Sequence, residues 1–147
     1  MLLCMARKKR LYKAHSYYHV FNRGNNKENI FFDKNDKIYF LENFSSYAKR
    51  YGIKVEGYCL MRNHFHSILK TGVRSHDLSR FLHAFMTKFA MYINRKYNRV
   101  GHVFQGRYNA KLIKTKRNFL RVKRYIENNP VKEGWVEDPD DYRWTRV

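Results

Sequence analysis

The order in which strand-like and helix-like patterns alternate constrains the fold of this chain more than any other feature. Aromatic and β-branched residues fill 17–23, and a Gly-Asn cluster follows them. Apolar residues then recur at helical spacing, with Asp33 or Asn35 as the expected N-cap and Gly52 as the expected end of the helix. Two strand-like runs with a break between them occupy 53–69. The first half of the chain therefore predicts a strand, a helix and two neighbouring strands.

The second half repeats the helix and the strand and then adds one more helix. Apolar positions predict a second helix capped by Asp77, and residues 108–114 have strand composition. Residues 116–129 form the last helical pattern, which we expect Pro130 to end because proline has no backbone N–H. The predicted fold class is α+β: a ferredoxin-like (βαββαβ) antiparallel sheet with an appended C-terminal helix.

The charge of the chain indicates the class of partner. There are 31 Lys and Arg residues against 12 Asp and Glu, a formal net charge of +19. Such an excess favours a polyanion, so we expect nucleic acid as the partner, ahead of an anionic membrane surface. Cys4 and Cys59 provide no disulfide framework, which suits a reducing compartment. We expect a cytoplasmic, nucleoid-associated protein with one domain over 1–147, in which residues 1–15 form a flexible basic arm.

Basic side chains are spread along the chain, and a subset of them is expected to follow a nucleic-acid backbone. A single member of such a set is more often an ordinary surface charge than a contact, so the prediction applies to the set. The candidate nucleic-acid-binding residues are Arg7, Lys8, Lys9, Arg10, Arg23, Arg62, Arg95, Arg99 and Arg107.

The run around His64-Phe65-His66 carries the strongest chemical pattern. On a strand, His64 and His66 project to one face and Phe65 to the other, so the two imidazoles can converge while Phe65 anchors the strand. Imidazole is a common ligand of divalent ions. Two exposed histidines on a solvated sheet face are the alternative, and the pattern alone favours that alternative because it is short and common.

Two residues of the last helix complete a possible site. Tyr125 and Asn129 are four residues apart and share a helix face, and the Asn129 amide oxygen suits a hard divalent cation. Placed over the histidine face of the sheet, this pair would give a metal site with a tyrosine beside it. However, Tyr125 is one of 12 tyrosines, and Asn129 before Pro130 is also an ordinary helix C-terminal residue.

Several segments, in order, resemble the single-tyrosine HUH transposases and, within them, the REP-associated tyrosine transposase group. The resemblance covers roughly residues 17–144. The matching segments are Tyr18-His19-Val20 with Arg23-Gly24-Asn25, Leu60 to His66, Gly101 to Tyr108, Tyr125 to Pro130, and Tyr142-Arg143-Trp144.

The resemblance implies roles for the residues at the matching positions. His64 and His66 correspond to the histidine pair, Tyr125 to the nucleophile and Asn129 to the third metal ligand. It implies Mg²⁺ or Mn²⁺ as cofactor, single-stranded DNA with hairpins as partner, and strand transfer through a 5′-phosphotyrosine. Similar proteins occur as monomers and as homodimers that exchange the tyrosine helix, so both states stay open.

Two other functions are compatible with the same residues. A non-catalytic nucleic-acid-binding module on this fold would explain the charge, but it gives no reason for His64, His66, Tyr125 and Asn129 to occur together. A zinc-binding structural or transcriptional protein is less favoured, because structural zinc sites are usually rich in cysteine.

Overall fold

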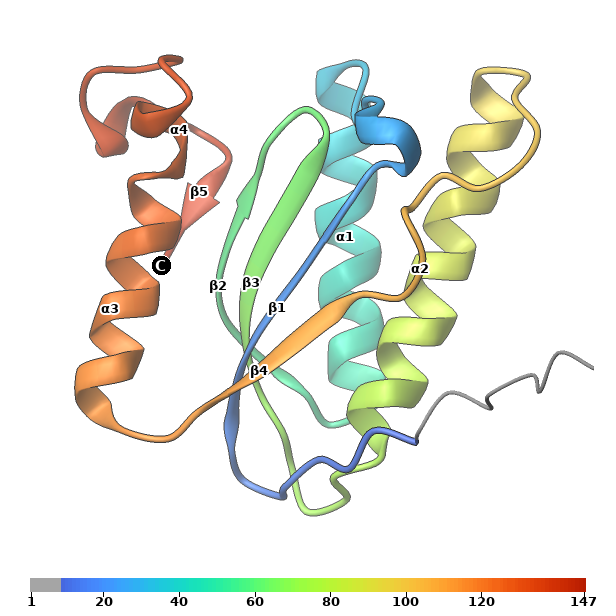
Figure 1. The fold of residues 1–147 in the computed structure, drawn as a ribbon. Helices are drawn as coiled ribbons and strands as arrows, with labels where there is room; N and C mark the ends of the chain where they lie inside the picture. The colour runs from blue at the N-terminus through green and yellow to red at the C-terminus, as the bar shows by residue number, and fades with distance from the viewer. Residues whose placement is uncertain (1–8) are drawn as a thin grey trace, which may run out of the picture.

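An antiparallel sheet of five strands separates the helices into two layers in the computed structural model, which describes residues 9–147 (Figure 1). The strand order is β4-β1-β3-β2-β5, so β3 is the central strand and β1 and β2 lie on either side of it. The strands are β1 (Tyr17–Arg23), β2 (Lys54–Leu60), β3 (His64–Lys70), β4 (Asn109–Ile113) and β5 (Thr145–Arg146).

The helices lie on both faces of this sheet. Figure 1 shows α1 and α2 together on one side and α3 on the other, where it contacts β2, β3 and β5. The α-helices are α1 (Lys34–Arg50), α2 (Asp77–Lys96), α3 (Lys116–Glu127) and α4 (Asn129–Lys132), and two short 3₁₀ turns are η1 (Asn25–Lys27) and η2 (Pro139–Asp141). None of the helices formed by residues 9–147 has the length and apolar character that a membrane crossing requires.

The ferredoxin-like prediction is confirmed, and β5 extends the sheet beyond it. The first four strands have the order expected for two interleaved β-α-β units, and the tyrosine-bearing helix is appended after β4. An aromatic core fills the space between the sheet and the α1–α2 layer. The rings of Phe40, Phe44, Phe65, Phe85 and Phe89 are almost completely buried there.

Two predicted helix boundaries were wrong. Asp77 is the first residue of α2 and not its cap; His76 holds the N-cap position, and the Asp77 carboxylate accepts hydrogen bonds from Arg74 and Arg80. Pro130 does not end the last helix. It lies in the first turn of α4, where a missing backbone N–H removes no intrahelical hydrogen bond. Asp33 caps α1 as predicted, in a reciprocal capping box with Asp36.

The Asp36 carboxylate is a buried junction between the start of α1 and the end of α2. Its Oδ2 accepts hydrogen bonds from the backbone N–H groups of Phe32 and Asp33 and from the Tyr97 hydroxyl. Its Oδ1 accepts from Tyr92 Oη at 3.0 Å and Lys96 Nζ at 2.8 Å. Burial alone would raise the pKa of this carboxyl, but these donors together hold its pKa below the usual value.

The C-terminal tail returns to the sheet after α4 and closes around a buried lysine. Lys37 Nζ lies 5.9, 5.4 and 5.2 Å from the ring centroids of Trp135, Tyr142 and Trp144. It also donates to Tyr142 Oη, which in turn donates to the Leu60 carbonyl oxygen at 2.7 Å. Burial lowers the pKa of Lys37 to about 8. The tail therefore packs back on the body around this cation.

Gly57 lets the end of the tail approach β2. β5 pairs with β2 through Tyr58 and Cys59, and the β2–β3 register shifts just before Gly57. A Cβ atom at Gly57 would lie 2.2 Å from Val147 Cγ1 and 2.9 Å from the Arg146 carbonyl oxygen. The missing side chain therefore makes room for this pairing.

The second half of the predicted basic arm contacts the body. Arg10 hydrogen-bonds to the Tyr108 carbonyl oxygen and stacks over the Tyr108 ring, and Tyr12 packs edge-on against Tyr18. These contacts hold this part of the arm close to β1 and β4. How far the arm is flexible stays a prediction.

Candidate functional site

The first two residues of the site stand on β3, at the end nearest the β2–β3 turn. His64 and His66 face α3, whereas Phe65 points into the aromatic core, where its ring lies 5.1 Å from that of Phe40. His66 is buried and His64 is half-buried. The two-residue alternation of the sequence therefore gives the predicted arrangement, with both imidazoles on one face and the phenylalanine on the other.

Asn129 brings its amide between the two histidines from the start of α4. Its Oδ1 lies 3.2 Å from His64 Nε2, and its Nδ2 lies 3.3 Å from His66 Nε2. The side chain is buried and its position is fixed by the break at Asn128, which ends α3 and begins α4. The structure thus brings together the three residues that the sequence nominated as metal ligands.

Both imidazoles favour the neutral form, because the pKa of each ring is lowered. Burial, together with the neighbouring His19 and His64 rings, lowers the pKa of His66 to about 3. Burial also lowers the pKa of His64, although the hydrogen bond with Asn129 and the charge of Glu133 oppose this. A neutral imidazole keeps a lone pair on one nitrogen, which is the form that binds a metal ion.

The hydrogen bonds behind the two rings favour a free Nε2 on each. His64 Nδ1 lies 2.7 Å from Asn63 Oδ1, and His66 Nδ1 lies 3.0 Å from His19 Nε2. A neutral His64 has one N–H and cannot donate to the oxygens of both Asn63 and Asn129. A divalent cation bound by His64 Nε2 and the Asn129 oxygen would remove this conflict, so the donor set fits such an ion.

No group of three His, Cys, Asp or Glu side chains within residues 9–147 is arranged to hold a metal ion. The candidate site differs from such a group because its third oxygen or nitrogen donor is an amide. Amide oxygens are ordinary ligands of hard divalent cations.

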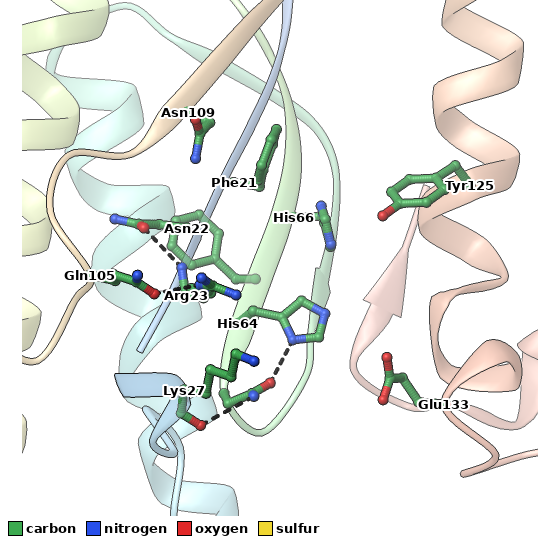
Figure 2. Close-up of a pocket in the computed structure, with 12 residues that line it drawn as sticks. Phe21, Asn22, Arg23, Lys27, His64, His66, Gln105, Asn109, Tyr125 and Glu133 are labelled. Carbon is green, nitrogen blue, oxygen red and sulfur yellow. Dashed lines mark hydrogen bonds between the residues drawn. The ribbon is translucent and has the colours of Figure 1, made fainter. Parts of the chain in front are cut away.

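Tyr125 completes the candidate site from α3. Its side chain is 46% exposed, and its ring meets the rings of His66 and His19 edge-on at centroid distances of 5.4 and 6.0 Å. Figure 2 shows the phenol directed from α3 across the cavity toward the histidines. The helix breaks between Tyr125 and Asn129, but both side chains still face β3.

His64, His66 and Tyr125 line a cavity of about 570 Å³, together with charged and aromatic side chains. Arg23 and Lys27 contribute positive charge, and Arg23 Nε donates to Gln105 Oε1 at 2.5 Å. Glu133 lies opposite His64 and is the acidic residue of the lining (Figure 2). The lining residues are Phe21, Asn22, Arg23, Lys27, Asn63, His64, Phe65, His66, Gln105, Asn109, Tyr125 and Glu133.

The predicted nucleic-acid-binding residues do not all gather at this cavity. Of the members of that set that the structure describes, only Arg23 lines it. Arg62 lies over the Trp135 ring, Arg99 pairs with Glu28, and Arg107 lines a separate cavity beside α2.

The remaining members of the set lie elsewhere. Lys9 and Arg95 are exposed, and Arg10 stacks on Tyr108. Arg7 and Lys8 lie outside the described residues.

His19, Phe21 and Glu133 were missed as site residues. The alternation along 17–23 places His19, Phe21 and Arg23 on one face, and this signal was available in the sequence. The pairing of Phe21 with His66 was not available, because it depends on the register between β1 and β3. Glu133 lines the cavity from the end of α4, a short helix that follows the break at Asn128 and that the sequence pattern did not predict.

Comparison with known proteins supports one family. The model of the family described as "Transposase IS200 like" matches residues 12–129. A solved structure of a REP-associated tyrosine transposase bound to a REP hairpin is similar, with a TM-score of 0.79 and 16% identity, covering 96% of this chain and 82% of that one. A protein assigned as a transposase from Deinococcus radiodurans R1 gives a TM-score of 0.57 at 16% identity, covering 84% of this chain and 97% of that one. The comparison with curated proteins gave no match.

Proposed function

This chain belongs to the IS200-like transposase family, and we propose that it cleaves and rejoins single-stranded DNA through Tyr125 with a divalent cation held by His64, His66 and Asn129. One observation carries the proposal. The Nε2 atoms of two neutral imidazoles each lie within 3.3 Å of one buried amide, and both imidazoles line the same cavity as a half-exposed phenol.

The residues of the site have different roles in the proposed phosphoryl transfer. When bound, Mg²⁺ or Mn²⁺ would polarise the scissile phosphate and offset its developing negative charge. Arg23 and Lys27 line the same cavity and attract the phosphate backbone. Asn63 and His19 hold the Nδ1 side of the two ligand histidines, which keeps each Nε2 directed toward Asn129.

Tyr125 supplies the nucleophile in the proposed reaction. Its Oη forms a bond to phosphorus, the bond from phosphorus to the 3′-oxygen breaks, and a 5′-phosphotyrosine and a free 3′-OH result. The phenol proton leaves Tyr125, and one proton is taken up by the departing 3′-oxygen. Attack by a 3′-OH reverses these steps and rejoins the strand without an external energy source.

Hairpins are the proposed form of the DNA partner. The similar solved transposase is bound to a REP hairpin, and the described part of this chain aligns with that structure over nearly all of its length. We extend hairpin binding to this chain on that basis.

Covalent trapping tests the proposal. The protein is incubated with hairpin-bearing single-stranded DNA and Mg²⁺ or Mn²⁺, and the products are separated on a denaturing gel. We expect a protein–DNA band that disappears with EDTA and in Tyr125→Phe but persists in Tyr47→Phe, a matched change on α1 at the opposite face of the sheet. Tight DNA binding with no such band across a broad panel of hairpins would instead support the non-catalytic binding module.

Metal binding is tested separately by calorimetric titration of Mn²⁺ in the absence of DNA. Asn129→Ala and His66→Ala should each weaken Mn²⁺ binding by at least about tenfold. Unchanged binding in both variants would contradict the assignment of the ligands, whatever the gel shows.

A further inference from the structure

Phe21 is an aromatic side chain that the core does not use. It lies on the site-facing side of β1, is half-buried, and lines the same cavity as Tyr125. Within residues 9–147 it belongs to neither of the two hydrophobic clusters that contain the buried apolar side chains. A large ring in such a place needs an explanation other than packing.

The sheet face around Phe21 is left open by α3. That helix packs on β2, β3 and β5 and meets β1 at Tyr17 and His19, whereas Phe21 lies further along β1 and faces Asn109 of the edge strand β4. Figure 2 shows the ring between Asn109 and His66, with Tyr125 on the far side of His66. The ring centroids of Phe21 and His66 are 5.5 Å apart, and those of His66 and Tyr125 are 5.4 Å apart.

Positive charge surrounds this ring on the open side. Lys111 is exposed and places Nζ 5.5 Å from the centre of the Phe21 ring, and Arg23 lies two residues along the same strand face. An accessible aromatic ring flanked by flexible cations is the arrangement with which proteins hold single-stranded nucleic acid, because bases stack on the ring while the cations bind phosphates.

We propose that Phe21 is a stacking platform for an unpaired base next to the scissile phosphate, with Lys111 and Arg23 holding the neighbouring phosphates. This inference rests on the proposed function, because it assumes that the cavity receives single-stranded DNA. Stacking there would place the strand along β1 and leave its phosphate beside His66 and Tyr125. Because every base has a flat face, the platform would position the strand without selecting its sequence.

Binding measured without cleavage tests the platform. Fluorescence anisotropy in EDTA follows a labelled oligo(dT) probe and, in parallel, a probe of equal length that is abasic throughout. Phe21→Leu keeps an apolar side chain and should weaken oligo(dT) binding by about 5- to 100-fold, whereas Phe21→Trp should bind as tightly as the wild type. The abasic probe should bind wild type and Phe21→Leu equally.

Two controls keep the result interpretable. Phe32→Leu changes a more exposed phenylalanine that does not line the cavity, and it should leave oligo(dT) binding unchanged. Far-UV circular dichroism and the thermal midpoint establish that each variant is folded, and Phe21→Tyr provides a second aromatic replacement should Phe21→Trp not fit.

The outcomes separate this inference from the proposed function. Unchanged oligo(dT) binding in Phe21→Leu, or an equal loss on the abasic probe, would overturn the platform. A Phe21-dependent preference for bases without any covalent band in the gel assay would support the platform and refute the chemistry. A covalent band with no effect of Phe21 on binding would do the reverse.

Discussion

Removing the charge of Asp36 should destabilise the protein far more than its position at the start of a helix suggests. The carboxylate accepts five hydrogen bonds, and its side chain is completely buried. In Asp36→Asn the amide oxygen can keep the three donors at the Oδ2 position. Its NH₂ group then faces Tyr92 and the Lys96 ammonium, which loses a charged partner.

The expected cost follows from that loss. A hydrogen bond to a charged group contributes about 1.5–3 kcal/mol, and breaking a buried ion pair by removing one partner costs about 3–5 kcal/mol. Lys96 keeps Asp33 at 2.8 Å and is partly exposed, so we expect Asp36→Asn to cost about 2–4 kcal/mol. Against a total stability of roughly 5–15 kcal/mol, this is a large fraction.

The assay is urea unfolding followed by circular dichroism, with Asp33→Asn as the matched control. Asn is as good an N-cap as Asp, and the Asp33 side chain is 44% exposed, so the control should change stability by only a few tenths of a kcal/mol. In a Lys96→Met background the cost of Asp36→Asn should fall, because the ammonium is no longer left beside an amide.

The stability difference between wild type and Asp36→Asn should depend on pH in a definite direction. The pKa of Asp36 in the fold is lower than its unfolded value near ~3.9, so its contribution is present above that pH and is lost as the pH falls through the folded pKa. The difference between wild type and Asp36→Asn should be constant from pH 7 to about 4 and shrink below it. A cost under about 1 kcal/mol, or no coupling to Lys96, would refute the reasoning.

Three further predictions concern the tail and its contacts. Lys37 titrates at about 8 in the fold, below its unfolded pKa, so wild type should gain up to ~1.4 kcal/mol per pH unit over Lys37→Met between pH 8 and 10; equal urea midpoint shifts at pH 7 and 9.5 would contradict this. Gly57→Val should cost about 1–3 kcal/mol by displacing β5, measured by thermal unfolding, whereas Lys54→Val, at an exposed position of the same strand, serves as the comparison. Burial raises the pKa of the Cys59 thiol to about 11, so mass spectrometry should show slow alkylation of its peptide at pH 8 in native protein and rapid alkylation in urea.

Sequence reasoning succeeded where a pattern is local. The alternation around Phe65 placed His64 and His66 on one face, and the Asp33 cap followed from residue chemistry at one helix end. Sequence reasoning failed where tertiary contacts determine the local structure. The Asp77 carboxylate accepts hydrogen bonds from two arginines and does not cap the helix. Pro130 lies in the first turn of α4, because the helix is interrupted at Asn128.

The same contrast between local patterns and tertiary contacts applies to the candidate site. The types and spacing of Tyr125 and Asn129 were enough to nominate them, since both lie close to one helix end. His19 and Phe21 could not be assigned to the site from sequence alone, because only the register of β1 against β3 brings them to His66. Long-range register is set by the whole sheet, and a strand carries little information about it.

The pairing of the C-terminal tail with β2 affects whether the tyrosine and the histidines of one reaction come from one molecule or from two. α3 is held at its start by β4 and beyond its end by β5 and the rings around Lys37, so exchanging this helix with a second copy would require unpairing β5 and exposing Tyr142 and Trp144. We therefore expect the tyrosine and the histidines of one turnover to come from the same polypeptide. The rate per molecule should then be independent of dilution, and a mixture of His66→Ala and Tyr125→Phe proteins should not restore activity.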